Sequence, residues 1–419
     1  MFHSWLRRLN QAIKAANRRT YANSYRPQLE AFEDRVVLST IYWSNPASGD
    51  WETAGNWSSG SVPGPDDDVI IDVPARISIT HDTGSDLVHS LSNNQNLVVT
   101  GGSSLTVTDT LSENGSLLVD VGSSMVANGT YSEAGTLTVL AGGSFFAAGA
   151  FSNFSGGTLT GGTYHIGGTF QFTGAAISTN AATIVLDAPA SQIVDEANSD
   201  ALAYFASNDV AGSFTIQNGR SFTTAGDFSN AGSLVLGPDS ALTVAGNFGN
   251  SGSLSLLDGS SFTASGGYRQ TGGSATLSNA TLAVSGLVDL QGGALSGTGT
   301  INASVQNAGV IQVGTSSAAG LLTINGDYTQ TATGVLNVKI GGFSPGTDYD
   351  QLAISGLATL GGTLNVKVIN GLRLSPGDDF TILTYGSWSE TTFATKNTGG
   401  VPLGAWYYFN ELDLRVPRY

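Results

Sequence analysis

Hydrophobic residues recur every 20 positions along the middle of the chain, and glycine or small polar residues fill the intervals. The stretch AGDFSNAGSL begins at Ala225, and the similar stretch AGNFGNSGSL begins at Ala245. When the chain is aligned with itself at this shift, the apolar residues fall into columns. One column holds Phe222, Leu242, Phe262 and Leu282, and a second holds Phe228, Phe248, Tyr268 and Val288. Four copies without an insertion predict a repeat protein built from one recurring unit.

The same alignment produces columns of residues suited to turns and ladders. Two glycine columns contain Gly226, Gly246, Gly266 and Gly286, and Gly232, Gly252, Gly272 and Gly292. A third column contains Asn230, Asn250 and Gln270. We expect the glycines to turn corners with positive φ, which costs glycine no steric strain. We expect the amides to form a hydrogen-bonded ladder, as stacked Asn and Gln side chains do in cross-β structures.

An earlier array has the same period in a different register. Its columns are Leu105, Met125 and Phe145; Leu111, Tyr131 and Phe151; and Val119, Val139 and Leu159. A less regular stretch, approximately residues 165–213, separates the two arrays.

A period of 20 residues is too short for a propeller blade of ~40–45 residues and suits one coil of a parallel β-helix. We therefore predict an all-β fold: a single-stranded, right-handed parallel β-helix with about 20 residues per coil. About thirteen coils between residues 85 and 345 would extend about 60 Å at ~4.8 Å per coil. The alternative is a β-sandwich or flat meander, but neither requires a strict spacing.

The two ends of the chain differ from the middle in their aromatic residues. All six tryptophans lie outside residues 58–387. Trp43, Trp51 and Trp57 are expected to form an apolar plug over the first coil, and Val69–Ile71 to begin a buried strand. Near the other end, alternating apolar residues predict longer strands, with a cap filled by Trp388, Trp406, Tyr407 and Phe409. Capping is needed because an open coil end is an unpaired sheet edge.

These patterns predict four segments: a basic leader or sorting segment at 1–39, an N-terminal cap at 40–80, the parallel β-helix at 81–345 and a C-terminal β cap at 346–419. Residues 1–20 have the spacing of a short basic helix, with Trp5, Leu9 and Ile13 on one face. This segment lacks the continuous apolar core of an ordinary secretory signal. It is interpreted either as a solvated tail or as a membrane-surface or export-related helix.

The segment RPQLEAFEDRVVLS, residues 26–39, resembles the LE-x-LEDR-x-LLS element near the N-terminus of large planctomycete surface proteins. The residues that match are Leu29, Glu30, Glu33, Asp34, Arg35 and Leu38, whereas Phe32 stands where leucine is commoner. The resemblance covers only about a dozen residues and implies a sorting signal and export. The alternative is a plain amphipathic turn of helix.

Two further resemblances concern the ends of the repeat. The segment from Trp43 to Asp72 is similar to the tryptophan-rich opening that precedes β-solenoids in bacterial exported proteins. Residues 349–387 resemble the closing segment of autotransporter passenger domains, which implies antiparallel strands covering the last coil. No outer-membrane barrel of alternating strands follows, so we expect either another export route or further sequence once attached.

Composition and charge exclude several classes of protein. The chain has no cysteine, which excludes disulfides and cysteine-based metal sites. The sequence contains no run of ~18 apolar residues, so we expect no transmembrane helix. The net charge is −16, and between Ile77 and Val338 only Arg220 and Arg269 oppose sixteen acidic residues. A surface so poor in cations cannot neutralise phosphates, so we expect no nucleic-acid partner.

Two groups of residues are candidates for a metal site. Asp66, Asp67 and Asp68 are consecutive, but hard-cation binding needs several converging oxygens. A solvated turn is the alternative. His81 and His89, with Asp82 and Asp86 between them, match no zinc spacing, and turn or surface positions explain them as well. His3 and His165 complete the histidines. No cofactor is expected.

The irregular stretch contains the strongest candidates for acid–base chemistry: Asp187, Asp195, Glu196, Asp200 and Asp209. A glycosidase needs two carboxyl groups ~5–9.5 Å apart. Asp195, Glu196 and Asp200 are the closest in sequence, although a loop or edge helix accounts for them equally well. A lyase is less favoured, because the stretch from Ile77 to Val338 has no lysine and only two arginines.

The sequence favours an exported structural or adhesin-like protein of the cell surface, without catalytic activity. Its expected location is extracellular, and its expected partners are cell-envelope or extracellular-matrix components, with polysaccharide among the candidates. The alternatives are a carbohydrate-active β-helix enzyme, either a polysaccharide hydrolase or a lyase, and a carbohydrate- or ion-binding module.

Overall fold

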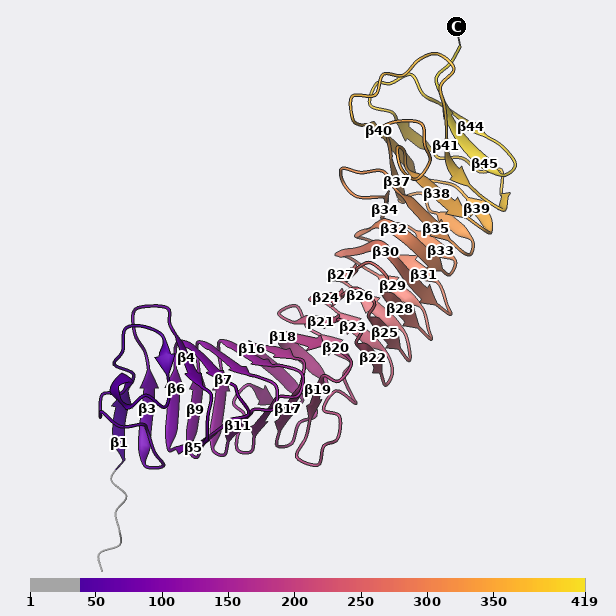
Figure 1. The fold of residues 1–419 in the computed structure, drawn as a ribbon. Coiled ribbons are helices and arrows are strands. Elements are labelled where there is room, and N and C mark those ends of the chain that lie inside the picture. Colours follow the sequence, from indigo (N-terminus) through magenta and orange to yellow (C-terminus); the bar gives the residue numbers. More distant parts are fainter. Residues whose placement is uncertain (1–37, 419) are drawn as a thin grey trace, which may run out of the picture. The chain divides into compact units, whose positions relative to one another are not determined.

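The computed structural model describes residues 38–418, which fold as a β-solenoid of about 13 turns with about 20 residues per coil. Within these residues the structure contains a single helical element, the short 3-10 helix η1 (Ala54–Asn56). Figure 1 shows the strands stacked in chain order from β1 to the C-terminal end. The prediction of an all-β parallel β-helix is confirmed.

Between residues 67 and 147, each coil contributes one strand to each of three faces. The first face consists of β1 (Ser39–Tyr42), β3 (Asp67–Ile71), β6 (Ser90–Asn93), β9 (Thr110–Glu113) and β12 (Thr130–Glu133). The second face consists of β2 (Gly49–Asp50), β4 (Ser78–His81), β7 (Asn96–Val99), β10 (Ser116–Val119), β13 (Thr136–Val139), β16 (Thr158–Ile166) and β18 (Thr179–Asp187). The third face consists of β5 (Ser85–Val88), β8 (Ser104–Val107), β11 (Ser124–Ala127), β14 (Ser144–Ala147), β17 (Thr169–Phe172) and β19 (Gln192–Val194).

The second array repeats these faces toward the C-terminus, and between the two arrays the strand pairing is continuous only on the second face. The first face holds β20 (Ser207–Asn208), β23 (Phe228–Asn230), β26 (Phe248–Asn250), β29 (Tyr268–Gln270), β31 (Val288–Leu290), β33 (Val305–Asn307), β36 (Tyr328–Gln330), β39 (Leu357–Thr359) and β42 (Ser387–Trp388). The second holds β21 (Ser213–Gln217), β24 (Ser233–Leu236), β27 (Ser253–Leu256), β30 (Ser274–Val284), β32 (Ala294–Asn302), β34 (Val310–Val313), β37 (Val335–Ile340), β40 (Thr363–Val368) and β43 (Thr395–Asn397). The third holds β22 (Ser221–Thr224), β25 (Ala241–Val244), β28 (Ser261–Ala264), the second halves of β30 and β32, β35 (Leu321–Ile324), β38 (Gln351–Ile354) and β41 (Asp379–Thr384).

The core forms because alternate residues of each strand point into the solenoid. In β24, Leu234 and Leu236 are fully buried, whereas Ser233 and Val235 are partly exposed. The repeat places the same residue class above and below each of these positions, so the apolar side chains form one continuous interior cluster.

The aromatic column predicted from the 20-residue shift is confirmed. Phe228 pairs with Phe248, Phe248 with Tyr268, and Tyr268 with Val288 in parallel register. The Phe228 and Phe248 rings are stacked, with centroids 6.1 Å apart and an interplanar angle of 7°. The rings of Phe248 and Tyr268 are tilted by 42°.

The predicted amide ladder is also confirmed and is longer than expected. Asn180, Asn208, Asn230 and Asn250 each donate through Nδ2 to the side-chain oxygen of the next member, and Gln270 ends the series. The donor–acceptor distances are 2.9, 2.8, 2.9 and 3.3 Å. All five side chains are buried, so each interior amide has a partner in the neighbouring coil.

The explanation proposed for the glycine columns is wrong at all eight positions. Gly226, Gly232, Gly246 and Gly252 do not have positive φ. At Gly252 a Cβ would lie 2.1 Å from the carbonyl oxygen of Gly232, so close backbone approach between coils excludes any side chain there. Positive φ occurs one residue later in the next two coils, at Gly273 and Gly293.

The third member of one predicted column is also wrong. Val119 pairs with Val139 as predicted, but Val139 pairs with Ile166 rather than Leu159. The reason is an insertion: β15 (Phe154–Ser155) forms an antiparallel pair with the start of β16, and this lengthens the coil. Leu159 remains buried and pairs with Phe154 and Asn180.

Three tryptophans close the N-terminal end, as predicted. Trp43, Trp51 and Trp57 are 2%, 0% and 2% exposed. Trp57 packs edge-on against both others, with centroid separations of 5.0 and 4.8 Å. Its indole Nε1 donates to the carbonyl oxygen of Trp51 at 2.7 Å, which fixes the plug in place.

The C-terminal cap is antiparallel as predicted, but its interior is different. β45 (Glu411–Arg415) pairs antiparallel with both β41 and β44 (Gly404–Tyr407). Trp406 and Phe409 are 52% and 80% exposed, so the prediction that they fill the cap is wrong. Trp388 and Tyr407 do pack against the core, with their rings stacked at a centroid separation of 5.6 Å. The buried interior of the cap consists of Phe380, Ile382, Leu383, Tyr385, Phe393, Leu412 and Leu414.

The parallel pairing extends beyond residues 81–345 at both ends. β1 pairs with β3 before residue 81, and β40 pairs with β43 after residue 345. The basic helix expected at residues 1–20 and most of the sorting-type element at 26–39 lie outside the described residues.

Candidate functional site

The loop between β19 and β20 contains the three carboxylates considered for catalysis. It is built of turns and contains no helix. Each carboxylate accepts hydrogen bonds from backbone amides: Asp195 from Ala197 and Ser199, Glu196 from Gly174, and Asp200 from Leu202. These bonds, 2.7–2.9 Å long, give all three residues a local role in shaping the loop.

A surface depression of about 300 Å³ lies beside this loop. Asp200 and Arg220 line it, together with Ser191 and Asn198. Asp195 and Glu196 are not among its lining residues. The structure therefore does not bring the three candidate carboxylates into one depression.

The other two acids of the irregular stretch are also engaged in hydrogen bonds. Asp187 Oδ2 pairs with His165 Nε2 at 2.7 Å, and Asp187 Oδ1 accepts from Asn218 Nδ2 at 2.5 Å. Asp209 Oδ1 accepts from the amide of Val210 at 2.7 Å. Both residues thus bridge neighbouring backbone or side-chain groups.

The three consecutive aspartates at the start of β3 do not converge. Asp66 is exposed in the turn, and Asp67 Oδ2 accepts from the amide of Gly64 at 2.7 Å. Asp68 Oδ1 accepts from Ser90 Oγ at 2.5 Å and faces His89 Nδ1 at 2.8 Å. The hydrogen bonds from Ser90 and His89 lower the pKa of Asp68.

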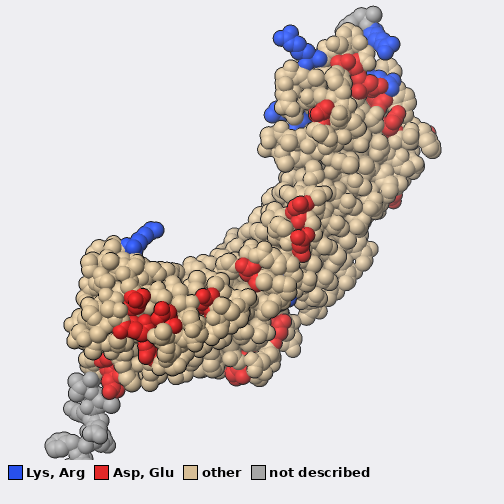
Figure 2. All heavy atoms as spheres, viewed as in Figure 1, with Lys and Arg blue, Asp and Glu red and all other residues tan. Residues whose placement is uncertain are grey.

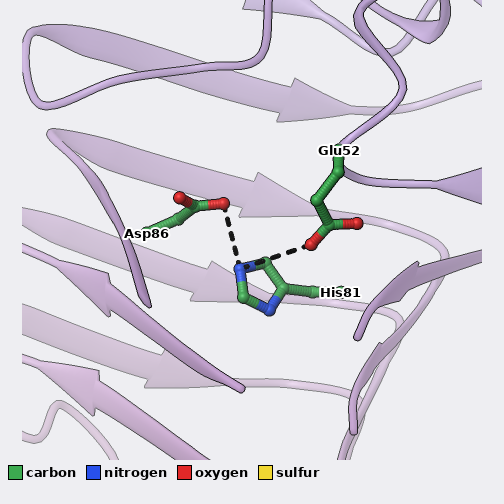
Figure 3. Close-up of side chains that lie close together, drawn as sticks. All are labelled: Glu52, His81 and Asp86. Carbon is green, nitrogen blue, oxygen red and sulfur yellow. Dashed lines mark hydrogen bonds and ion pairs between the residues drawn. The ribbon is translucent and has the colours of Figure 1, made fainter. Parts of the chain in front are cut away.

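A different set of three residues converges at the N-terminal end of the solenoid. Figure 3 shows the carboxylates of Glu52 and Asp86 approaching the same ring nitrogen of His81 from two sides. His81 Nε2 lies 3.1 Å from Asp86 Oδ2 and 3.8 Å from Glu52 Oε1. The His81 side chain is fully buried, whereas those of Glu52 and Asp86 are 29% and 30% exposed. These three ligand atoms lie within 4.8 Å of one another.

The fold explains why these residues meet. β2 stacks on β4 with Asp50 opposite Thr80, and this places the Trp51–Glu52 segment next to His81. The chain then turns directly into β5, which carries Asp86 on the third face. The sequence associated His81 with Asp86 but missed Glu52, and it grouped them with His89 and Asp82. His89 instead pairs with Asp68, and Asp82 is exposed.

Two more acids lie inside the solenoid. Glu113 and Glu133 occupy equivalent positions of β9 and β12 and are 0% and 2% exposed. Asn93 Nδ2 donates to Glu113 Oε2 at 3.0 Å, and Tyr131 OH donates to Glu133 Oε2 at 2.6 Å. Burial raises the pKa of Glu113 well above its ordinary value and raises that of Glu133 to about 7.

The face of the solenoid seen in Figure 2 carries few charged side chains. Figure 2 shows an outer face that is mostly uncharged, with acidic side chains in small groups and basic ones mainly toward the C-terminal end. A hollow of about 730 Å³ runs over β30 and β32 and is lined by Ser, Thr, Gly, Asn and Leu residues with Asp258. Its lining includes no aromatic side chain. Between residues 38 and 418, no helix has the length and apolar character needed to cross a bilayer.

Comparison with known proteins gives a partial match. Residues 42–143 match a family model described as a domain of unknown function, DUF8693. The matched residues cover about a quarter of the chain and include the tryptophan plug, Glu52, His81 and Asp86. No curated protein matches the chain.

Proposed function

We propose that this chain is an exported structural protein of the cell surface, adhesin-like, and without catalytic activity. The observation that supports this most strongly is the second face of the solenoid. Its parallel pairing runs from β2 to β43 without an interruption, so every coil is hydrogen-bonded to the coils on both sides. Such a stack needs no single active site to be useful, because its length and stiffness are themselves functional properties.

The outward-facing side chains suit this role. In the regular coils they are mainly serine, threonine and glycine, as in β24, β25, β26 and β27. Few of these side chains are long or charged enough for a protease to recognise. The backbone amides form hydrogen bonds with the neighbouring coils and are therefore not free to enter a protease active site. A solenoid of this kind would hold a binding surface at a distance from the cell and would resist proteolysis.

Export is supported by the sequence rather than by the fold. The resemblance of residues 26–39 to a planctomycete sorting element, together with the resemblance to autotransporter passengers, favours a location outside the cytoplasm. The net charge of −16 and the absence of cysteine are compatible with that location.

The local hydrogen bonds of Asp195, Glu196 and Asp200 favour a structural over a hydrolytic protein, because each carboxylate already has a backbone partner. A glycosidase would instead need two carboxyl groups directed at a common bound sugar. Replacement of all three residues with alanine should therefore leave any surface phenotype intact.

The decisive experiment is immunolabelling of intact source cells, followed by protease treatment of the cell surface. Labelling of unpermeabilised cells is expected, with a cytosolic protein as the negative control. Signal only after permeabilisation would contradict the surface assignment. A parallel screen of acidic and neutral polysaccharides tests the enzyme alternative, which would be established by turnover that disappears in the triple alanine variant.

A further inference from the structure

The Glu52–His81–Asp86 cluster has more negative charge than its own hydrogen bonds can satisfy. Both carboxylate oxygens of Glu52 are shielded from solvent and have no hydrogen-bond donor. Burying an ionised carboxylate without a partner is strongly unfavourable. Asp86 directs its Oδ2 at the same nitrogen, His81 Nε2, at 3.1 Å. A positive charge between the three groups would remove this cost.

The other side of the His81 ring indicates where that charge lies. Ser103 is buried, and its Oγ donates to the carbonyl oxygen of His81 at 2.8 Å. The single hydroxyl hydrogen is then used, and Ser103 Oγ is left to accept from His81 Nδ1, also at 2.8 Å. In this tautomer Nε2 presents a lone pair to two carboxylates. The other tautomer satisfies Asp86 but still leaves Glu52 without a donor.

The residue columns show that this polarity is specific to the coil that contains β4 and β5. His81 stacks on Val99, which stacks on Val119 and then on Val139. Asp86 stacks on Leu105 in the neighbouring column, where the following coils place Met125 and Phe145. Two column positions that are apolar in these later coils are thus occupied here by His81 and Asp86, whose side chains can bind a metal ion.

We propose that the cluster binds a divalent transition-metal ion of the Zn²⁺ type. One imidazole nitrogen and two carboxylate oxygens are ligands that zinc accepts, whereas Mg²⁺ and Ca²⁺ prefer oxygen alone. Zinc–ligand bonds of ~2.0–2.2 Å in a tetrahedron separate the ligand atoms by about 3.4 Å. The observed separations of 3.1 and 3.8 Å lie on either side of that value. Two carboxylates would neutralise the ion, and the fourth position would be open to water.

The bound ion would fasten the N-terminal end of the solenoid. Glu52 follows β2, His81 ends β4 and Asp86 lies in β5, so three separate segments would share one ion. Trp51 packs edge-on against the imidazole, with ring centroids 5.9 Å apart, and so helps to hold the ring in place. Ser103 would act as a positioning residue, since it holds the ring in the tautomer that exposes Nε2.

The test uses the full chain, purified without a histidine tag and stripped of metal by a chelator. Titration with Zn²⁺ against a chromophoric competitor should give one tight site per chain and a higher Tm. Nitrogen-detected NMR of the histidines should show that Zn²⁺ changes the resonance of His81 Nε2 while Nδ1 keeps its proton. This measurement requires no variant and therefore does not depend on any variant folding.

Variants then assign the ligands. Glu52→Gln and Asp86→Asn keep the side-chain shape and should each weaken Zn²⁺ binding by more than the ~10–100-fold typical of losing an outer partner. Ser103→Ala should weaken it by about that 10–100-fold. Asp82→Asn, at an exposed neighbour, and His165→Gln, in the other histidine–aspartate pair, are matched controls and should bind as tightly as the parent chain.

Two results would overturn the proposal. The first is Zn²⁺ binding that survives unchanged in Glu52→Gln and Asp86→Asn, which would place the ion elsewhere. The second is an NMR spectrum in which His81 Nε2 carries a proton and remains unaffected by Zn²⁺. That outcome would make the proton, held between imidazole and carboxylates, the missing positive charge.

Discussion

Glu113 and Glu133 are buried at a position where other coils place asparagine or glutamine. Asn93 occupies the same position in the coil before them, and Asn230 and Asn250 hold the corresponding position in the second array. One oxygen of each glutamate, Oε1, is buried without a hydrogen-bond partner. A neutral amide or a protonated carboxyl group fits such a position better than an ion does.

The first prediction concerns the pH dependence of stability. Burial raises the pKa of Glu133 from 4.5 to about 7, so the folded protein binds this proton more tightly than the unfolded chain. The contribution of Glu133 to the free energy of unfolding is therefore complete below pH 4.5 and is lost as the pH rises toward 7. At ~1.36 kcal/mol per pH unit the loss is about 3 kcal/mol. Glu133→Gln should remove this dependence and be more stable than the parent at pH 8.

Urea unfolding at pH 5 and pH 8 measures this difference directly. The exposed Glu390→Gln serves as the matched control and should keep the pH dependence of the parent chain. If Glu133→Gln loses stability between pH 5 and 8 as steeply as the parent, the carboxyl group of Glu133 is not the source of the effect.

The second prediction concerns glycine and the distance between coils. A Cβ at Gly252 would lie 2.1 Å from the carbonyl oxygen of Gly232, whereas a Cβ at Gly249 in β26 would meet nothing within 4 Å. Gly252→Ala should therefore lower the free energy of unfolding by about 1–3 kcal/mol, as overpacking does. Gly249→Ala, in the same coil, should be neutral or slightly stabilising. Equal effects of the two substitutions in thermal unfolding would refute the steric explanation.

The coils of the second array that share the 20-residue period, between Ser221 and Ser261, are interchangeable units. Ser221 pairs with Ala241, and Ala241 pairs with Ser261, so the residues before and after one period face the same neighbours. The stability of such a stack is approximately a sum of coil and interface contributions.

The third prediction follows from this equivalence. Deletion of residues 241–260 joins Ser240 to Ser261 and places Phe262 on Phe222, so the shortened chain should fold with a Tm close to that of the parent. Deletion of residues 241–250 removes half a coil and places strand residues where turns are needed. It should lose cooperative unfolding in circular dichroism. If both deletions behave alike, the coil of 20 residues is not the structural unit.

The repeat could be predicted because stacking puts residues of one type above each other at a constant shift. The prediction worked for Phe228, Phe248 and Tyr268, where the coils have equal length. It was wrong at Leu159, because the β15–β16 insertion changes the coil length without leaving a pattern in the sequence. Trp406 and Phe409 were wrong because aromatic character alone does not say which face of an edge strand is buried.

The Glu52–His81–Asp86 cluster could not be assembled from the sequence for a related reason. His81 lies 18 residues before its stacking partner Val99, and Asp86 lies 19 before Leu105, so neither falls in a 20-residue column. Glu52 reaches the site only because β2 stacks on β4 across an interval of 30 residues. If the shorter intervals from β4 to β7 and from β5 to β8 are taken into account, the signal in the sequence is a polar residue in each of two apolar columns.

At the scale of the whole molecule, the two ends of the solenoid need protection that the coils between them do not. The last parallel strands are β41, β42 and β43, which pair with β38, β39 and β40, and β45 then pairs antiparallel with both β41 and β44. This reversal ends the parallel edge and covers the interior columns that include Leu352 and Ala358.

The fourth prediction is that the C-terminal cap prevents self-association. A chain ending at Pro376 lacks β41–β45 and exposes the edges of β38, β39 and β40 together with the end of the apolar core. Unpaired edges of this kind pair with other chains, so the truncated protein should form oligomers whose size increases with concentration in sedimentation velocity. The chain lacking residues 241–260 keeps both ends and should sediment as the parent does. If the truncated chain also sediments as the parent does, the strands after Pro376 are not needed to block the edge, and the protection of this end must come from β37–β40 themselves.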